Sequence, residues 1–359
     1  MVRHTLAALM LLAAAPAVAG PLGVAGDYNA FVLGNTNMQY VDTHGKLAVG
    51  GNLQLNGVQI GSQLSQGSPT NLVVGGNLNV TSGSINGSTV VYGNVTANNP
   101  TFHGNLSAGG SVWINPNQGG SVNGSVTYGT SFTKPGWMNP PATQGSITQP
   151  VDFAAAAASL TALSQAQVGP NDPAGTFQWN QLFLTGGAGL NVFGITEAVL
   201  EGSTGGFNIN APSGATVIIN VAGSDLTLLN TGLNLSGGIT MDKILWNFYE
   251  ATSLTFNGSW NGSVLATQAA AKAQYGAMNG NLIVAALHGY GGPSTTTSLE
   301  VHTVINGQPT FFSGTTRPVG NPDPDPNPNP VPEPGTMALF GLGAMLAAMS
   351  RRRRQTAAA

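Results

Sequence analysis

The stretch that decides the fold is residues 42–77, DTHGKLAVGGNLQLNGVQIGSQLSQGSPTNLVVGGN. It holds two copies of one unit, LAVGGNL at 47–53 and LVVGGNL at 72–78. In each copy a short apolar run is stopped by a Gly-Gly-Asn turn, and a polar and apolar alternation follows, which is typical of strand, turn and strand. We therefore expect Val49 and Val74 at equivalent inward positions on neighbouring coils.

Weaker copies of the unit recur along the chain, at 91–95 (VYGNV), 102–106 (FHGNL), 261–266 (NGSVLA) and 279–284 (NGNLIV). Self-similarity at roughly 15 to 25 residues is typical of a solenoid, in which stacking of the coils makes the core. The sequence thus predicts a mainly β protein, a solenoid like a parallel β-helix. A β-sandwich whose hairpins share turn chemistry is the alternative.

The composition limits the possible partners. Only 6% of the 359 residues are charged and 51 are glycine, against averages of about 25% charged residues and about 7% glycine in globular domains. The net charge is −3, and clustered Lys and Arg, which phosphate binding requires, occur only at the far C-terminus. We expect no nucleic-acid partner, and the absence of cysteine excludes disulfides and thiolate chemistry.

The N-terminus has the pattern of a secretory signal peptide, which we assign to residues 1–19. Arg3 precedes the apolar run 6–15, and Ala-Val-Ala at 17–19 is a small-residue cleavage signal. Signal peptidase is therefore an expected partner during export across the inner membrane. The main domain is expected over residues 20–317.

One helix is predicted beside the strands. Pro, Gly and Gln dominate residues 135–150, and Asp152 is then a suitable N-cap for a helix over residues 154–167. It carries no Lys or Arg, so we expect it to pack along the solenoid and not on a membrane. The apolar positions near one face are Phe153, Ala157, Leu160 and Leu163.

Strand signals resume at Phe177 and continue to Val304, separated by Gly, Asn and Ser turns. The second half is therefore expected to wind as well. Two arrangements are open: one continuous solenoid with the helix as an excursion, or two stacked layers.

From Asp27 onwards the chain resembles the choice-of-anchor A domain, a bacterial surface domain found with several different anchors. The resemblance implies an exported, non-catalytic surface protein. His44 is a departure, because an acidic residue is usual there. The matching segments are 27–52 (DYNAFVLGNTNMQYVDTHGKLAVGGN), 72–77, 208–221 (NINAPSGATVIINV), 245–254 (LWNFYEATSL), 262–266 and 280–285.

Residues 318–334, PVGNPDPDPNPNPVPEP, are a Pro-rich linker. Such a segment forms extended polyproline II at about 3.1 Å per residue, which gives a stalk of roughly 50 Å. Asp323 and Asp325 lack the turn glycine and the bidentate acid of a calcium loop.

The C-terminal segment 331–354 combines a Pro-Glu-Pro element, an apolar run at 337–349 and four arginines. The run is suited to a transmembrane helix that the arginines would hold at the cytoplasmic face. The segment resembles the PEP-CTERM sorting signal, which implies recognition and cleavage by an exosortase, with only transient membrane anchoring before release to the cell surface or the extracellular matrix. A plain tail anchor with a Pro-rich hinge is the alternative. The recognition residues would be Pro332, Glu333 and Pro334, and the membrane stop Arg351, Arg352, Arg353 and Arg354.

Candidate chemistry is sparse. The chain contains no HExxH, GxSxG or GxxxxGK[ST] motif. The acid pair Glu197 and Glu201, expected on one face of a strand, and the pair Asp242 and Lys243 are the candidates for a polysaccharide lyase or hydrolase on a β-helix scaffold. We expect no catalytic residue, cofactor or metal, and keep that enzyme as the alternative function.

The sequence favours a non-catalytic adhesin or a structural protein of the extracellular polysaccharide or biofilm matrix. A third option, binding of ice or another crystal surface, would need a regular Thr-x-Thr recurrence, which is not present. Aromatic side chains could stack on sugar rings, although core filling is the commoner role. The tryptophans considered are Trp113, Trp137, Trp179 and Trp260, and the isolated histidines are His44, His103, His288 and His302.

Overall fold

A computed structural model of the chain describes residues 20–39, 42–66, 69–169, 171, 175–289, 300–302, 304–305, 308–309 and 311–319. The residues up to Val319 belong to one compact unit, so we expect this unit to fold on its own. The predicted signal peptide and the segment from residue 320 onwards lie outside the described residues.

Parallel strands stack into coils with three strand positions each. In the first stack, most neighbouring strands pair through only three or four residues. In spatial order it contains β16 (Ala142–Gln144), β14 (Val126–Tyr128), β11 (Leu106–Ala108), β8 (Ser88–Val91), β6 (Thr70–Val74), β4 (Leu47–Val49), β1 (Ala30–Val32), β29 (Leu282–Gly289), β27 (Ser263–Tyr275), β24 (Ile244–Asn247), β21 (Thr216–Ala222) and β19 (Leu190–Thr196).

The second stack carries the surface that matters below, and long strands bend between it and the first or third stack. Its strands, in spatial order, are β15 (Phe132–Thr133), β12 (Val112–Ile114), β9 (Val95–Asn98), β7 (Leu78–Ile85), β5 (Leu53–Ile60), β2 (Thr36–Gln39), the second parts of β29 and β27, β25 (Ser253–Asn257) and β22 (Asp225–Leu229).

The third stack completes the coils. Its strands are β13 (Ser121–Val122), β10 (Thr101–Phe102), the second parts of β7 and β5, β3 (Asp42–Thr43), β30 (Glu300–His302), β28 (Ala277–Asn279) and β26 (Trp260–Asn261). Gly57 has a φ of 64° and Gly83 a φ of 112°, and these bends carry β5 and β7 from the second stack into the third.

The remaining elements lie outside these three stacks. A separate four-stranded sheet contains β17 (Thr176–Gln178), β18 (Gln181–Thr185), β20 (Gly206–Asn210) and β23 (Leu233–Ser236), and a two-stranded ribbon contains β31 (Val304–Ile305) and β32 (Gln308–Pro309). The helices are α1 (Phe153–Gln167) and α2 (Glu197–Gly202), with 3-10 turns η1 (Gly23–Asp27) and η2 (Met241–Lys243).

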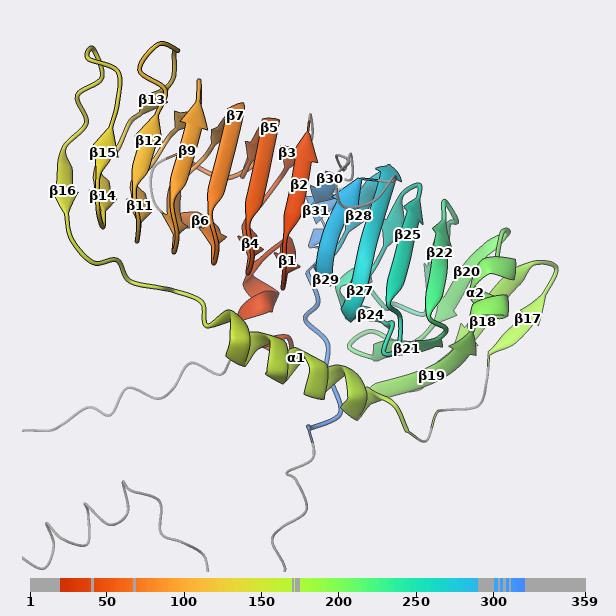
Figure 1. The fold of residues 1–359 in the computed structure, drawn as a ribbon. Helices are drawn as coiled ribbons and strands as arrows, with labels where there is room; N and C mark the ends of the chain where they lie inside the picture. The colour runs from red at the N-terminus through yellow and green to blue at the C-terminus, as the bar shows by residue number, and fades with distance from the viewer. Residues whose placement is uncertain are drawn as a thin grey trace, which may run out of the picture. The chain divides into compact units, whose positions relative to one another are not determined.

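The two halves of the chain meet in the middle of one stack. The first half winds outward from β1 to β16, α1 runs back along the flank, and the second half winds inward from the opposite end to β29 (Figure 1). There β1 pairs in parallel with β29 and β3 with β30. Of the two arrangements that the sequence left open, the structure has one continuous solenoid with the helix as an excursion. It differs from a simple winding because the first and last coils of the chain are neighbours in the middle of the stack.

The repeat-based expectation for the first half is confirmed. Val49 pairs with Val74 on adjacent strands, and both side chains are fully buried in the same core. The second half winds with the repeat of 18 residues, because Asn261 pairs with Asn279 and Val264 with Leu282. The described part of the chain is thus a mainly β, largely parallel, solenoid-like fold with one substantial helix.

The Gly-Gly-Asn turns hold consecutive coils together. The Asn side chain of one turn accepts the backbone N–H of the next, and the second glycine leaves room for it, since a Cβ on Gly76 would lie 2.6 Å from Asn52 Oδ1. Because each turn satisfies a donor of its neighbour, turn residues repeat with the coil. The N–H groups of Asn52, Asn77, Asn94 and Ser111 donate to Oδ1 of Asn35, Asn52, Asn77 and Asn94 at 2.7, 2.8, 2.8 and 2.8 Å.

The central strands of the first stack are covered on both faces. Their inward side chains fill the solenoid core, whereas their outward ones form a second apolar cluster with α1 and η1. Strands buried on both faces read as continuous apolar runs, which accounts for LAV, LVV and LIV at this position of the coil. The outward members include Phe31, Ala48, Val73, Leu265 and Ile283.

The predicted helix is confirmed as α1. Asp152 Oδ1 accepts the N–H of Ala155 at 3.0 Å, as expected of an N-cap. Leu160 and Leu163 are buried, but Ala156, and not Ala157, completes the buried stripe. Near the C-terminal end the contact is polar, because Ser164 donates to Asn247 Oδ1 at 2.6 Å.

Candidate adhesive surface

A row of polar side chains points outward from the second stack. Successive strands place these residues in direct register, so neighbours in the row are about 4.8 Å apart. Their side chains are half-buried or exposed, and none is charged. In order along the stack, this first row contains Asn37, Gln54, Asn79 and Thr96, followed by Trp113 and Thr133.

A second row runs parallel to the first, two residues further along each strand and therefore about 6.6 Å away. It ends in a side-chain contact, where Asn115 Nδ2 donates to Asn98 Oδ1 at 2.8 Å. We call the two rows together the polar face. The second row contains Gln39, Asn56, Thr81 and Asn98.

A groove of about 800 Å³ lies along the first row. The turn asparagines form one wall, the first row forms the other, and His288 of β29 lies among the lining residues. The groove crosses the strands, so it offers an equivalent set of amide or hydroxyl groups at each of the coils that contribute Asn37, Gln54, Asn79 and Thr96. Amide side chains are both donors and acceptors of hydrogen bonds, which suits a ligand rich in hydroxyl groups.

The sequence analysis noticed the alternation after each turn but assigned no role to the polar residues within it. Gln54 lies between the buried Leu53 and Leu55, and Asn79 between Leu78 and Val80. The signal was therefore present as the polar half of a period-two pattern repeated with the coil. The row holds no Thr-x-Thr recurrence, as the sequence indicated.

The histidines are distributed over different parts of the fold. His44 stacks on His302 with a ring distance of 4.3 Å, where β3 meets β30. Burial, and then the neighbouring His302, lower the pKa of His44 below its ordinary value. His103 lies 3.4 Å from Asn123 Nδ2. Among the described residues, no cluster of three His, Cys, Asp or Glu side chains could hold a metal ion.

The acid pair Glu197 and Glu201 lies on α2, so the expected strand context is wrong. Glu201 Oε1 accepts the backbone N–H of Thr227 at 2.8 Å. That carboxylate ties a short helix to β22.

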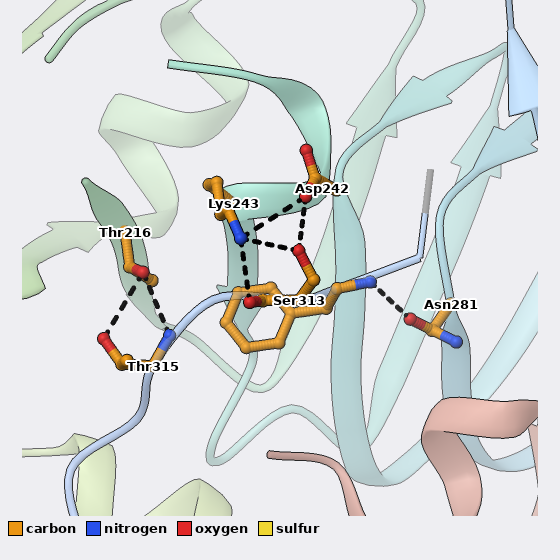
Figure 2. Close-up of polar contacts among 7 residues, drawn as sticks. Thr216, Asp242, Lys243, Asn281, Ser313 and Thr315 are labelled. Atoms are coloured by element: carbon orange, nitrogen blue, oxygen red, sulfur yellow. Dashed lines mark hydrogen bonds and ion pairs between the residues drawn. The ribbon is translucent and has the colours of Figure 1, made fainter. Parts of the chain in front are cut away.

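Asp242 and Lys243 hold a strap, which we define as residues 311–319 (Figure 2). Lys243 Nζ is 3.5 Å from Asp242 Oδ2 and donates to Ser313 Oγ at 2.7 Å, while Ser313 Oγ donates to Asp242 Oδ2. Further along, the N–H of Thr315 donates to Thr216 Oγ1 at 3.0 Å. Asp242 Oδ2 and Lys243 Nζ are thus engaged in fixing the last described segment.

The strap should be sensitive to acid. Burial raises the pKa of Asp242, but hydrogen bonds from Ser313 and Thr240 and the charge of Lys243 outweigh it, so the pKa is below its ordinary value. A lowered carboxyl pKa contributes stability above the unfolded pKa of about 3.9, and this contribution is lost as pH falls through the folded pKa.

We expect Asp242→Asn to speed proteolysis of the strap several-fold at pH 7, measured by intact mass, and to remove the acid sensitivity of the strap below pH 4. Asp225→Asn, at an exposed position, should change neither the rate of proteolysis nor its sensitivity to acid. Equal rates for both variants would contradict the role of Asp242 in holding the strap.

The tryptophans divide into two groups. Trp260 is 2% exposed and packs edge-to-face on Trp246 with ring centroids 4.9 Å apart, so it fills the core. Trp113, Trp137 and Trp179 are 37%, 64% and 79% exposed. Trp113 alone of these three belongs to the first row and could stack on a sugar ring there.

The sorting residues and the predicted transmembrane helix lie outside the described residues. Within the described part of the chain, no helix has the length and apolarity needed to cross a membrane. Pro332, Glu333, Pro334 and the arginines at 351–354 therefore stay predictions.

The geometry defines a solenoid-like protein with an uncharged polar face along its second stack. A family model for the ice-binding-like adhesive domain matches residues 21–294, and a model for the PEP-CTERM protein-sorting motif matches residues 330–354. The chain belongs to the ice-binding-like adhesive domain family, to which the choice-of-anchor A family is closely related. The sorting motif indicates export, surface sorting and processing by the exosortase system.

Among solved structures, the crystal structure of an ice binding protein from an Antarctic bacterium of the Flavobacteriaceae is similar at 13% sequence identity. The match covers 79% of this chain and 98% of that chain, with a TM-score of 0.30. No curated protein matches the chain.

Proposed function

We propose that this protein is a non-catalytic surface adhesin whose polar face binds polysaccharide of the extracellular or biofilm matrix. The observation that carries the proposal is the pair of uncharged amide and hydroxyl rows repeated over four successive coils, with a groove along one of them. A sugar polymer presents hydroxyl groups at regular intervals, and an array of fixed donors and acceptors can engage several of them at once. The surface matches such a ligand in polarity.

The candidate residues for the alternative, a carbohydrate-active enzyme, are occupied elsewhere. Glu201 binds a backbone amide, and Asp242 and Lys243 bind the strap. Membership of an adhesive-domain family supports the same choice.

The polysaccharide proposal is tested by retention of residues 20–319 on extracellular polysaccharide from the producing cells. A variant with Gln54, Asn79 and Thr96 all changed to Ala should bind about tenfold more weakly or worse, because each hydrogen bond contributes roughly 0.5–1.5 kcal/mol. The matched control changes Gln59, Ser84 and Thr101 to Ala. These residues come from β5, β7 and β10 but point outward from the third stack. Equal retention of both variants would count against the polar face.

We further propose the order of segments after the adhesive unit: a Pro-rich stalk at 318–334 and a sorting segment at 331–354. The apolar run at 337–349 would halt in the membrane with the arginines inside, and the exosortase would cut at or near residues 331–334. Two prolines around Glu333 fix an extended backbone with one charge, which a protease near the membrane can read.

Glu333→Ala should leave the precursor in the membrane fraction, because the single charge of the recognition element is lost. The measurement is intact mass and fractionation in cells that contain an exosortase. Glu300→Ala, an exposed acid on β30, serves as the control and should be processed normally. Wild-type surface protein that still carries residues 337–359 would make the segment a plain anchor.

A further inference from the structure

We call the junction where β1 and β2 pair with β29 the seam. The first row continues across the seam into the second half of the chain, and there it contains basic side chains. Lys272 of β27 pairs in register with His288 of β29, and Thr255 of β25 pairs with Lys272. Thr36 pairs with Leu287, so Asn37, the next residue, is the neighbour of His288 in the row. A basic pair therefore interrupts the row, between Asn37 on one side and Thr255 on the other.

The charge of Lys272 is not neutralised by the described residues. Its Nζ is 3.4 Å from Ser253 Oγ, and no carboxylate of the described chain forms an ion pair with it. The acid on the same surface, Asp225, lies on β22, two strands from β27. Lys272 is partly exposed, so an external anion can reach it.

His288 connects this charge to the groove. It is among the residues that line the groove, and its Nδ1 is buried without a hydrogen-bond partner in the described part of the chain. Burial, and then the charge of Lys272, lower the pKa of the ring below its ordinary value. An anion placed beside both side chains would offset the charge of Lys272 and could accept a hydrogen bond from the imidazole ring.

We propose that Lys272 and His288 form a carboxylate-binding subsite at the end of the groove, so that the polysaccharide bound by the polar face carries uronate residues. This inference rests on the proposed function and specifies its ligand class. The neutral rows would bind sugar hydroxyls along the polymer, and the basic pair would bind one carboxylate per copy of the protein. A single Lys without an arginine fork gives a point charge, which suits one exposed carboxylate on a flexible polymer.

The probes are polygalacturonate and its methyl ester, in which an uncharged methyl ester replaces each carboxylate. The unit of residues 20–319 should bind the acid form about tenfold more tightly than the ester at low salt, and the difference should shrink as sodium chloride is added. Lys272→Gln should bind the acid form about as weakly as the wild type binds the ester. Lys272→Arg should restore most of the preference, and Lys46→Gln, a charge removed elsewhere, should leave it intact.

Three results overturn the inference. In the first, the wild type binds acid and ester equally, and in the second, Lys272→Gln with an unchanged melting temperature keeps the full preference. In either case Lys272 and His288 do not bind a carboxylate, while the polysaccharide proposal stands. If the wild type binds neither polymer, uronate is not the ligand. The retention experiment with matrix polysaccharide then decides the proposed function separately, since it does not depend on Lys272.

Discussion

Leu160→Asp is expected to lower the free energy of unfolding by about 4 kcal/mol or more. Leu160 is 3% exposed on the face of α1 that packs against the outward side of the first stack, so the variant removes apolar area and buries an unpaired charge. For a unit of this size the melting temperature should fall by about 10 °C. Thermal melting followed by circular dichroism measures it.

Ala158→Asp is the matched control. It introduces the same residue two positions away, at an exposed position of α1, and should shift the melting temperature by only a degree or two. Similar losses in both variants would mean that the helix responds to the introduced charge itself. No loss in either would mean that α1 is not docked on the strands.

Gly75→Val is expected to have a comparable effect on the stack itself. A Cβ at this position would lie 2.4 Å from the carbonyl oxygen of Gly50 on the previous coil and 3.1 Å from the ring of Phe153. Backbone cannot yield there without separating two coils, so the variant should lose about 3 kcal/mol or more or fail to accumulate as folded protein. Gly136→Val is the control, because no atom lies within 4 Å of its Cβ position. Equal stability of the two variants would contradict the spacing of the turns.

The repeat within each half could be predicted because its causes are local. The contact between successive Gly-Gly-Asn turns requires particular residues, which are visible in the sequence. A glycine stands where the Asn of the neighbouring coil needs space, and an Asn accepts the next backbone N–H. The helix was equally local, with Asp152 at its N-cap and Leu160 and Leu163 at helical spacing.

The seam could not be predicted. It pairs AFV at 30–32 with LIV at 282–284, and short apolar runs of this kind fit many neighbours equally well. Closing so long a loop is decided by total burial, which no local pattern reports. The strap was missed for the same reason, since Ser313 and Asp242 are ordinary polar residues until the fold brings them together.

Only part of the candidate surface could be predicted from the sequence. Its polar residues follow from the period-two alternation at Gln54 and Asn79, but the row they form depends on strand register, which a shift of one residue would turn inward. Glu197 and Glu201 show the converse case. Their spacing suggested one face of a strand, and the chain instead forms one short helical turn there.

The central claim is that polysaccharide lies on the polar face. Because the chain has no cysteine, Thr96→Cys can be labelled at that one position with an environment-sensitive fluorophore, and Asn123→Cys provides the same label at an exposed site beside the third stack. Titration with matrix polysaccharide should shift the emission of the label at position 96 in a saturable way and leave the label at position 123 unchanged. A silent label at position 96, or an equal response at both positions, would contradict adhesion through this face.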